Sequence, residues 1–177
     1  MTKKIVIKIA VILMLIAVIK LFYPCLAFGQ GNGLYEFIGR NGKHGFMDKT
    51  GKVIIPAKYV NVYFKFSEGL AFVSEKRTSN GDFIWICIDT LGNKKFSLGR
   101  KYAPEECFSE GYAVIENWFS DCYLFVDKDG KKVFDKKFDD ACNFTNGFAC
   151  VCNKDFNDCH FINKRGQYAQ HFPIPCK

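Results

Sequence analysis

The sequence predicts an all-β fold: an array of about 3–4 stacked antiparallel β-meander or hairpin repeats of about 36–42 residues, after an N-terminal signal helix. Three observations lead to this prediction. One motif occurs three times, a second motif occurs four times, and no later segment shows the 3.6-residue apolar period of a helix. Repeats of this length are small units that bury their apolar faces against their neighbours.

The first motif is Phe-Ser-Glu-Gly followed by alternating apolar residues. Its copies begin at Phe66, Phe108 and Phe144, which places them 42 and 36 residues apart, and the third copy reads Phe-Thr-Asn-Gly. The alternation after each Gly predicts a β-strand, for example from Leu70 to Ser74. Because Ser and Glu recur at the same place in the unit, we interpret them as residues that brace a turn, not as catalytic groups.

The second motif, Asp/Asn-x-x-Gly, predicts a tight hairpin turn. It begins, at intervals of 41, 38 and 36 residues, at Asp48, Asp89, Asp127 and Asn163. The first side chain can accept hydrogen bonds from backbone N–H groups of the turn, and Gly tolerates the positive φ that closes it. A strand is expected before each turn and after most of them, for example at Lys131–Phe134. One short helical turn is also allowed near Tyr102–Glu106.

The N-terminus has the pattern of a secretory signal. Three lysines precede an uninterrupted apolar run of 11 residues, Ile9–Ile19, and small residues at Ala27 and Gly29 allow cleavage before Gln30. A membrane-spanning helix would need about 20 apolar residues. Residues 1–29 are therefore expected to be a signal peptide, with an uncleaved anchor as the alternative, and the protein is expected to be secreted or periplasmic.

The remaining chain, 30–177, is expected to be one repeat domain. Its predicted units are 35–75, 76–115, 116–152 and a partial unit at 153–177. Without the four lysines of the N-terminal segment the chain keeps 21 basic and 18 acidic residues, so its formal charge falls from +7 to +3. Acids and bases also alternate, whereas a nucleic-acid binder should carry a concentrated basic stripe. We therefore expect no nucleic-acid partner.

The first unit resembles the bacterial WG-repeat family. Residues 42–59 read Gly-Lys-His-Gly-Phe-Met-Asp-Lys-Thr-Gly-Lys-Val-Ile-Ile-Pro-Ala-Lys-Tyr, and residues 66–71 read Phe-Ser-Glu-Gly-Leu-Ala. The resemblance covers roughly residues 35–166 with degenerate copies, since the Trp-Gly pair reads His44-Gly45, Trp85-Ile86, Tyr123-Leu124 and Cys159-His160. It implies an all-β repeat array, often extracytoplasmic, that mediates interactions and generally has no assigned catalytic residue.

Eight of the nine cysteines follow residue 29, and an even count in an exported chain favours disulfides. Cys152 and Cys159 flank a six-residue loop and can face each other across a hairpin. Cys107 and Cys142 precede the first motif in adjacent units, so stacking would bring them near each other. Reduced buried thiols remain one alternative, and a metal site formed by Cys150, Cys152, Cys159 and His160 is another. The Cys-x-Cys spacing fits structural zinc poorly, so we predict no metal site.

Trp118 and Phe119 lie in one predicted loop, and Phe156 lies in the equivalent loop of the next unit. Aromatic side chains at hairpin tips either fold back onto the sheet or contact a partner. These three residues are the candidate binding surface, for an unknown protein or glycan.

No acid/base constellation, phosphate loop or cofactor motif is found, so we predict no catalytic residue and no cofactor. The sequence favours an exported, non-enzymatic interaction module of the bacterial envelope. The alternative is a structural envelope protein anchored at the inner membrane by an uncleaved N-terminus, and membrane contact is expected only in that case.

Overall fold

The structure is a computed structural model, and it describes residues 33–63, 65–153 and 158–169. These residues form thirteen strands in four small antiparallel sheets, with no helix among them. The predicted all-β repeat fold is confirmed for this part of the chain. The predicted signal peptide, residues 1–29, lies outside the described residues. Within the described ranges, no helix has the length and apolar character needed to cross a membrane.

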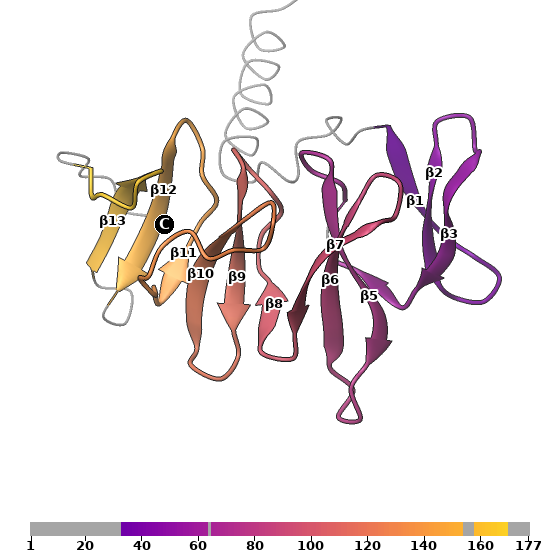
Figure 1. Cartoon of the computed structure of the whole chain (residues 1–177), viewed down its shortest axis with the longest axis horizontal. Coiled ribbons are helices and arrows are strands. Elements are labelled where there is room, and N and C mark those ends of the chain that lie inside the picture. The colour runs from indigo at the N-terminus through magenta and orange to yellow at the C-terminus, as the bar shows by residue number, and fades with distance from the viewer. Residues whose placement is uncertain (1–32, 64, 154–157, 170–177) are drawn as a thin grey trace, which may run out of the picture.

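The four sheets follow one another in chain order and stand in a row (Figure 1). The first contains β1 (Leu34–Ile38), β2 (His44–Asp48) and β3 (Val53–Tyr59). The second contains β4 (Asn61–Val62), β5 (Leu70–Arg77), β6 (Phe83–Asp89) and β7 (Lys94–Gly99). The third contains β8 (Tyr102–Pro104), β9 (Tyr112–Asn117) and β10 (Cys122–Asp127). The fourth contains β11 (Asp140–Ala141), β12 (Phe148–Asn153) and β13 (Asp158–Asn163).

The sheets are divided differently from the predicted sequence units. The predicted boundaries after residues 75, 115 and 152 fall inside β5, β9 and β12. Each of these strands follows a Phe-Ser-Glu-Gly turn and pairs with the next strand of the chain, because a short loop joins the two. In the first sheet β1 is the equivalent of β5, because Leu34 pairs with Asp48 in the same way as Leu70 pairs with Asp89. In the second, third and fourth sheets the strand after the motif glycine therefore lies between a short strand that precedes the motif (β4, β8 or β11) and the next strand of the chain.

The Asp/Asn-x-x-Gly turns have the chemistry that the sequence predicts. Asp48 Oδ1 accepts hydrogen bonds from the N–H groups of Thr50 (2.8 Å) and Lys52 (3.1 Å). Gly51, at φ 84°, donates its N–H to the Asp48 carbonyl at 3.0 Å. The same three bonds recur at Asp89, Asp127 and Asn163. These side chains therefore close four equivalent hairpins.

The Phe-Ser-Glu-Gly motif forms a two-residue hairpin turn. Ser67 and Leu70 exchange both backbone hydrogen bonds, at 2.9 and 3.0 Å. Glu68 and Gly69 have φ values of 50° and 85°, which is the left-handed pair of a type I′ turn. The third copy keeps this geometry with Asn at the Glu position, at φ 54°.

The Ser and Glu of one turn bind the next unit. Ser67 Oγ donates to the carbonyl of Phe108 at 2.7 Å, and the Glu68 carboxylate accepts from the Gly111 N–H at 2.9 Å. Glu68 also forms an ion pair with Lys128 at 3.1 Å. The same contacts recur one unit later, from Ser109 to Phe144 and from Glu110 to Gly147 and Lys164. The signature residues thus connect neighbouring units.

Three hydrophobic clusters fill the spaces between successive sheets. Successive residues of β5 point to opposite faces, so Ala71 and Val73 join Phe46 in the first cluster, while Leu70 and Phe72 lie in the second. The third cluster lies between the last two sheets and is rich in phenylalanine. Both faces of the inner sheets are therefore buried, which explains the dense apolar runs of their strands.

Two local expectations are wrong. Tyr102–Pro104 is strand β8, antiparallel to β9, and not a helical turn. The helical region is disfavoured for Ala103 because Pro104 follows it. Lys131–Phe134 is not a continuous strand: Lys132 makes one isolated bridge to Val126.

Candidate functional site

The loop between β9 and β10 contains Trp118 and Phe119, two of the three predicted binding residues, and both are exposed. Trp118 is 42% exposed and Phe119 is 79% exposed. The Trp118 indole N–H donates to Glu116 Oε2 at 3.0 Å, and its backbone N–H donates to the Lys101 carbonyl at 3.1 Å. Phe119 N–H donates to the side chain of the buried Asn117 at 3.1 Å. The loop is therefore held in place with its rings in solvent.

The loop between β5 and β6, residues 78–82, lies beside it. Thr78 N–H donates to the Asp82 carbonyl at 2.7 Å, and Asp82 N–H donates to Thr78 Oγ1 at 3.1 Å. At the base of the loop, Arg77 donates to the Gly81 carbonyl at 3.1 Å, and its guanidinium lies 4.0 Å from the ring centroid of Phe83. These contacts close the loop on itself and tie it to strand β6.

A hollow of about 330 Å³ separates the two loops. It is lined by the rings of Phe83, Trp118 and Phe119, by Arg100, and by polar side chains of the 78–82 loop. A second hollow of about 380 Å³ is lined by Lys76, Lys94, Glu75 and again Arg100. Arg100 thus belongs to both hollows. It lies in the link between β7 and β8, next to Lys101, whose carbonyl accepts from the Trp118 N–H.

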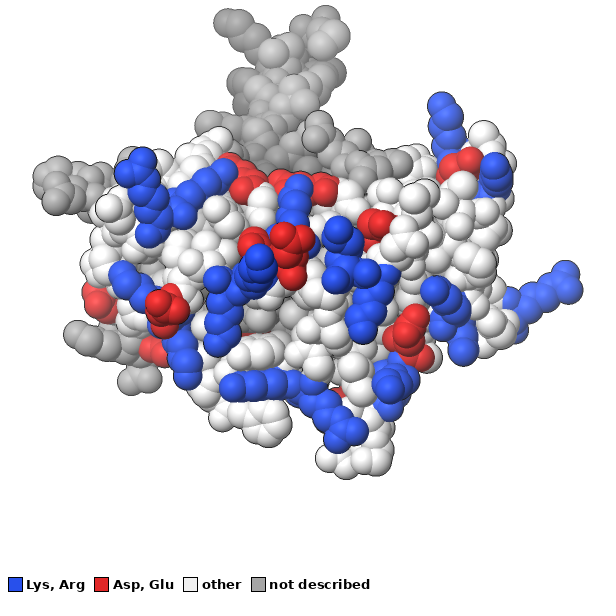
Figure 2. Space-filling model, viewed as in Figure 1, with Lys and Arg blue, Asp and Glu red and all other residues white. Residues whose placement is uncertain are grey.

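Charge is mixed over the face seen in Figure 2. Lys and Arg side chains are spread across it with Asp and Glu among them, not gathered in one stripe. Basic side chains also cross the lower edge, between the β5–β6 and β9–β10 loops, which project there in Figure 1. The aromatic hollow therefore opens beside a locally positive surface.

The structure describes two of the three residues that were predicted to form the binding surface. Trp118 and Phe119 line the first hollow together. Phe156 lies outside the described residues. Phe83 and Arg100 were missed, because neither stands in the loop that the aromatic pattern indicated. The turn-rich composition of residues 77–82 signals the neighbouring loop, but only the stacking of units brings it to Trp118.

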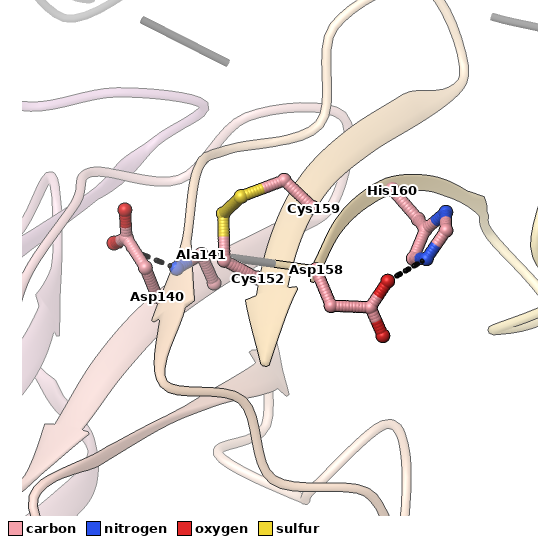
Figure 3. Close-up of a disulfide and its surroundings, with 6 residues drawn as sticks. All are labelled: Asp140, Ala141, Cys152, Asp158, Cys159 and His160. Atoms are coloured by element: carbon pink, nitrogen blue, oxygen red, sulfur yellow. Dashed lines mark hydrogen bonds and ion pairs between the residues drawn. A yellow bond between two sulfur atoms is a disulfide. The ribbon is translucent and has the colours of Figure 1, made fainter. Parts of the chain in front are cut away.

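A disulfide joins Cys152 and Cys159, the pair expected across this hairpin (Figure 3). The two residues are direct partners of strands β12 and β13, with their Cα atoms 4.0 Å apart. Next to it, Asp158 Oδ1 and His160 Nε2 lie 2.6 Å apart. Cys150 is also disulfide-bonded, so the three thiols of the alternative metal set are not free ligands.

The predicted pair Cys107–Cys142 is wrong. Cys142 is a free, exposed thiol, whereas Cys107 is disulfide-bonded and buried. The register explains the error: Cys107 immediately precedes Phe108, and the residue that immediately precedes Phe144 is Asn143. Asn143 accordingly meets Cys107 across the stack, where its Nδ2 donates to the Cys107 carbonyl at 2.7 Å.

One carboxyl near this contact is strongly perturbed. Burial, with the charges of Glu105 and Asp140, raises the pKa of Glu106 to about 7. Its nearest hydrogen-bond partner is Asn143 Nδ2 at 3.4 Å. The group can hold a proton near neutral pH. Desolvation, with the charges of Asp140 and Glu106, also raises the pKa of the free Cys142 thiol to about 11, so this thiol is protonated at neutral pH.

The family comparison agrees with this geometry. Residues 45–76 and 125–155 match the family described as WG containing repeat. Both segments are thus similar to WG repeats. The first match runs from β2 through nearly all of β5, so the repeat as a sequence unit spans the first sheet from β2 onward and ends within strand β5 of the second sheet. No curated protein matches the chain.

Proposed function

We propose that this protein is an exported, non-enzymatic module of the bacterial envelope that binds a protein or glycan partner at the hollow between the β5–β6 and β9–β10 loops. The observation that carries the proposal is the joint exposure of Trp118 and Phe119 beside that hollow. Clustered aromatic side chains in water mark contact sites, because single exposed apolar residues are common but apolar clusters are not.

The fixed geometry of the loop supports binding. Trp118 is held by its indole N–H and by its backbone N–H, at 3.0 and 3.1 Å from their acceptors. A side chain that is already ordered loses little conformational entropy when a partner docks. The arrangement thus suits recognition better than a mobile tip would.

The repeats also support a binding role for the loops, because the recurring residues maintain the fold. The Ser and Glu of the WG signature contact the next unit, so the recurring residues serve the fold. In such arrays the loops vary and carry recognition on a rigid scaffold. The N-terminal pattern of lysines, apolar run and small residues supports export, and the Cys152–Cys159 disulfide suits an oxidising compartment.

The test is capture of partners from an envelope extract by the full chain. Changing Trp118 and Phe119 together to Ala should abolish capture and leave a cooperative unfolding transition with at most a small fall in its midpoint, since neither side chain belongs to the buried core. Leu91→Ala is the matched control, because Leu91 is 73% exposed on a different turn. Undiminished capture by the Trp118/Phe119 variant would contradict the proposal. N-terminal sequencing of the mature protein tests export, with Gln30 as the expected first residue.

A further inference from the structure

We infer that the ligand of this surface is an acidic polysaccharide, with sugar rings on Trp118 and Phe119 and carboxylates on Arg100. The inference rests on the proposed function of the same surface and names its ligand class. Three features carry it: the exposed rings, the polar lining of the first hollow, and the excess of positive charge in the second.

The rings suit a sugar. A pyranose has an apolar face of C–H groups and an edge of hydroxyls, so it packs flat on an aromatic ring while its edge makes hydrogen bonds. The Trp118 N–H is already bound to Glu116, which leaves the ring face as the part of the side chain available to a ligand. Thr78, Asn80 and Asp82 line the same hollow and supply donors and acceptors for hydroxyls.

The charges favour an anionic polymer. Among the described residues Arg100 is in no ion pair, and it lines both hollows. The second hollow adds Lys76 and Lys94 against one carboxylate, Glu75, which lies 3.9 Å from Lys58. A carboxylate on a sugar can take the fork of donors on Arg100. Two hollows that share one arginine suit an extended chain better than a single small molecule.

Asp82 limits where the negative charges of the ligand can lie. It lines the aromatic hollow, where it would repel a phosphate or a carboxylate but can accept hydrogen bonds from sugar hydroxyls, so the carboxylates of the polymer are expected on the side of Arg100 that lines the second hollow. The neighbouring guanidinium of Arg77 is engaged with Phe83 and the Gly81 carbonyl. Basic side chains are spread over the visible face with acidic ones among them and do not form the continuous stripe expected of a nucleic-acid binder.

The test is titration of the full chain with polygalacturonate, using dextran as the neutral polymer. We expect polygalacturonate to bind, dextran to bind at least about tenfold more weakly, and Trp118→Ala and Arg100→Gln each to weaken polygalacturonate about tenfold or more. Added salt should weaken it further. Arg40→Gln and Leu91→Ala are matched controls, exposed on other loops, and should bind as the parent does.

Two further probes, a thymidine oligonucleotide and poly-glutamate, decide the class. If either binds as tightly as polygalacturonate, or if polygalacturonate binds no better than dextran, the inference is overturned. If polygalacturonate fails while Trp118 still governs capture of a protein from the envelope extract, the inference fails and the proposed function stands. Phe119→Ala, at a site 79% exposed, provides a second variant should Trp118→Ala perturb folding, and it too must weaken binding.

Discussion

At the scale of single residues, the turn glycine of the Asp/Asn-x-x-Gly motif meets two demands. Gly130 has φ 79°, and a Cβ built on it would lie 2.5 Å from Phe96 Cγ. Phe96 belongs to β7 of the preceding sheet. A Cβ on Gly166 would likewise meet Phe134 at 2.8 Å. At these two turns Gly is therefore needed both to close the hairpin and to let an aromatic ring approach.

These two demands can be separated by substitution. Gly51 has φ 84° with nothing within 4 Å of a built Cβ, so Gly51→Ala tests the backbone strain alone. We expect it to lower the free energy of unfolding by about 1–2 kcal/mol. Gly130→Ala should lower it by about 1–3 kcal/mol more, because Phe96 must move. Urea unfolding of both variants measures the difference, and equal losses would show that the close approach is unimportant.

At the scale of elements, local chemistry could be predicted and pairing across the stack could not. The Asp48 and Asp89 turns follow from one side chain and one Gly a few residues apart, so the sequence alone identifies them. Where one sheet ends and the next begins depends on pairing: the strand after each Phe-Ser-Glu-Gly motif could pair mainly with the strand before the motif or with the strand that follows it. The sequence repeat is the same for both pairings, so it does not reveal the sheet boundaries. The predicted unit boundaries accordingly fell within strands.

The same limit explains the cysteines and the binding surface. Cys152 and Cys159 are joined by one hairpin, so their pairing could be expected. For Cys107 an offset of one residue decided whether Asn143 or Cys142 lies opposite. Trp118 was found by composition, but its neighbour Arg100 reaches the hollow through stacking of the second and third sheets.

The hairpin of β12 and β13 gives a prediction at this scale. Changing Cys152 and Cys159 together to Ala should lower the free energy of unfolding by roughly 2–3 kcal/mol, because the disulfide closes a short loop with a sequence separation of 7. Cys142→Ala, at a free and exposed thiol on the neighbouring segment, should leave it unchanged within about 0.5 kcal/mol. Denaturant unfolding without reductant compares them, and a loss confined to Cys142→Ala would refute the assignment.

At the scale of the whole molecule, stability is shared between neighbouring units. Contacts between sheets join β3 with β5, β6 with β8, and β10 with β11, which are neighbours in the row. The three hydrophobic clusters lie in the same three gaps. In arrays of this kind, stability is approximately a sum of unit terms and nearest-neighbour interface terms. Damage to one gap should therefore weaken its two sheets before it weakens the distant ones.

Phe125 tests this expectation. Its ring centroid lies 5.2 to 6.0 Å from those of Phe134, Phe138 and Phe144 in the last gap. Phe125→Ala should lower stability by about 3–5 kcal/mol and speed hydrogen exchange in β9–β13, while β1–β3 keep their protection. Phe46→Ala is the counterpart in the first gap, where Phe46 meets Phe66 at 4.8 Å, and should give the opposite pattern. Uniformly faster exchange in both variants, measured by mass spectrometry, would mean that the row unfolds as a single cooperative unit.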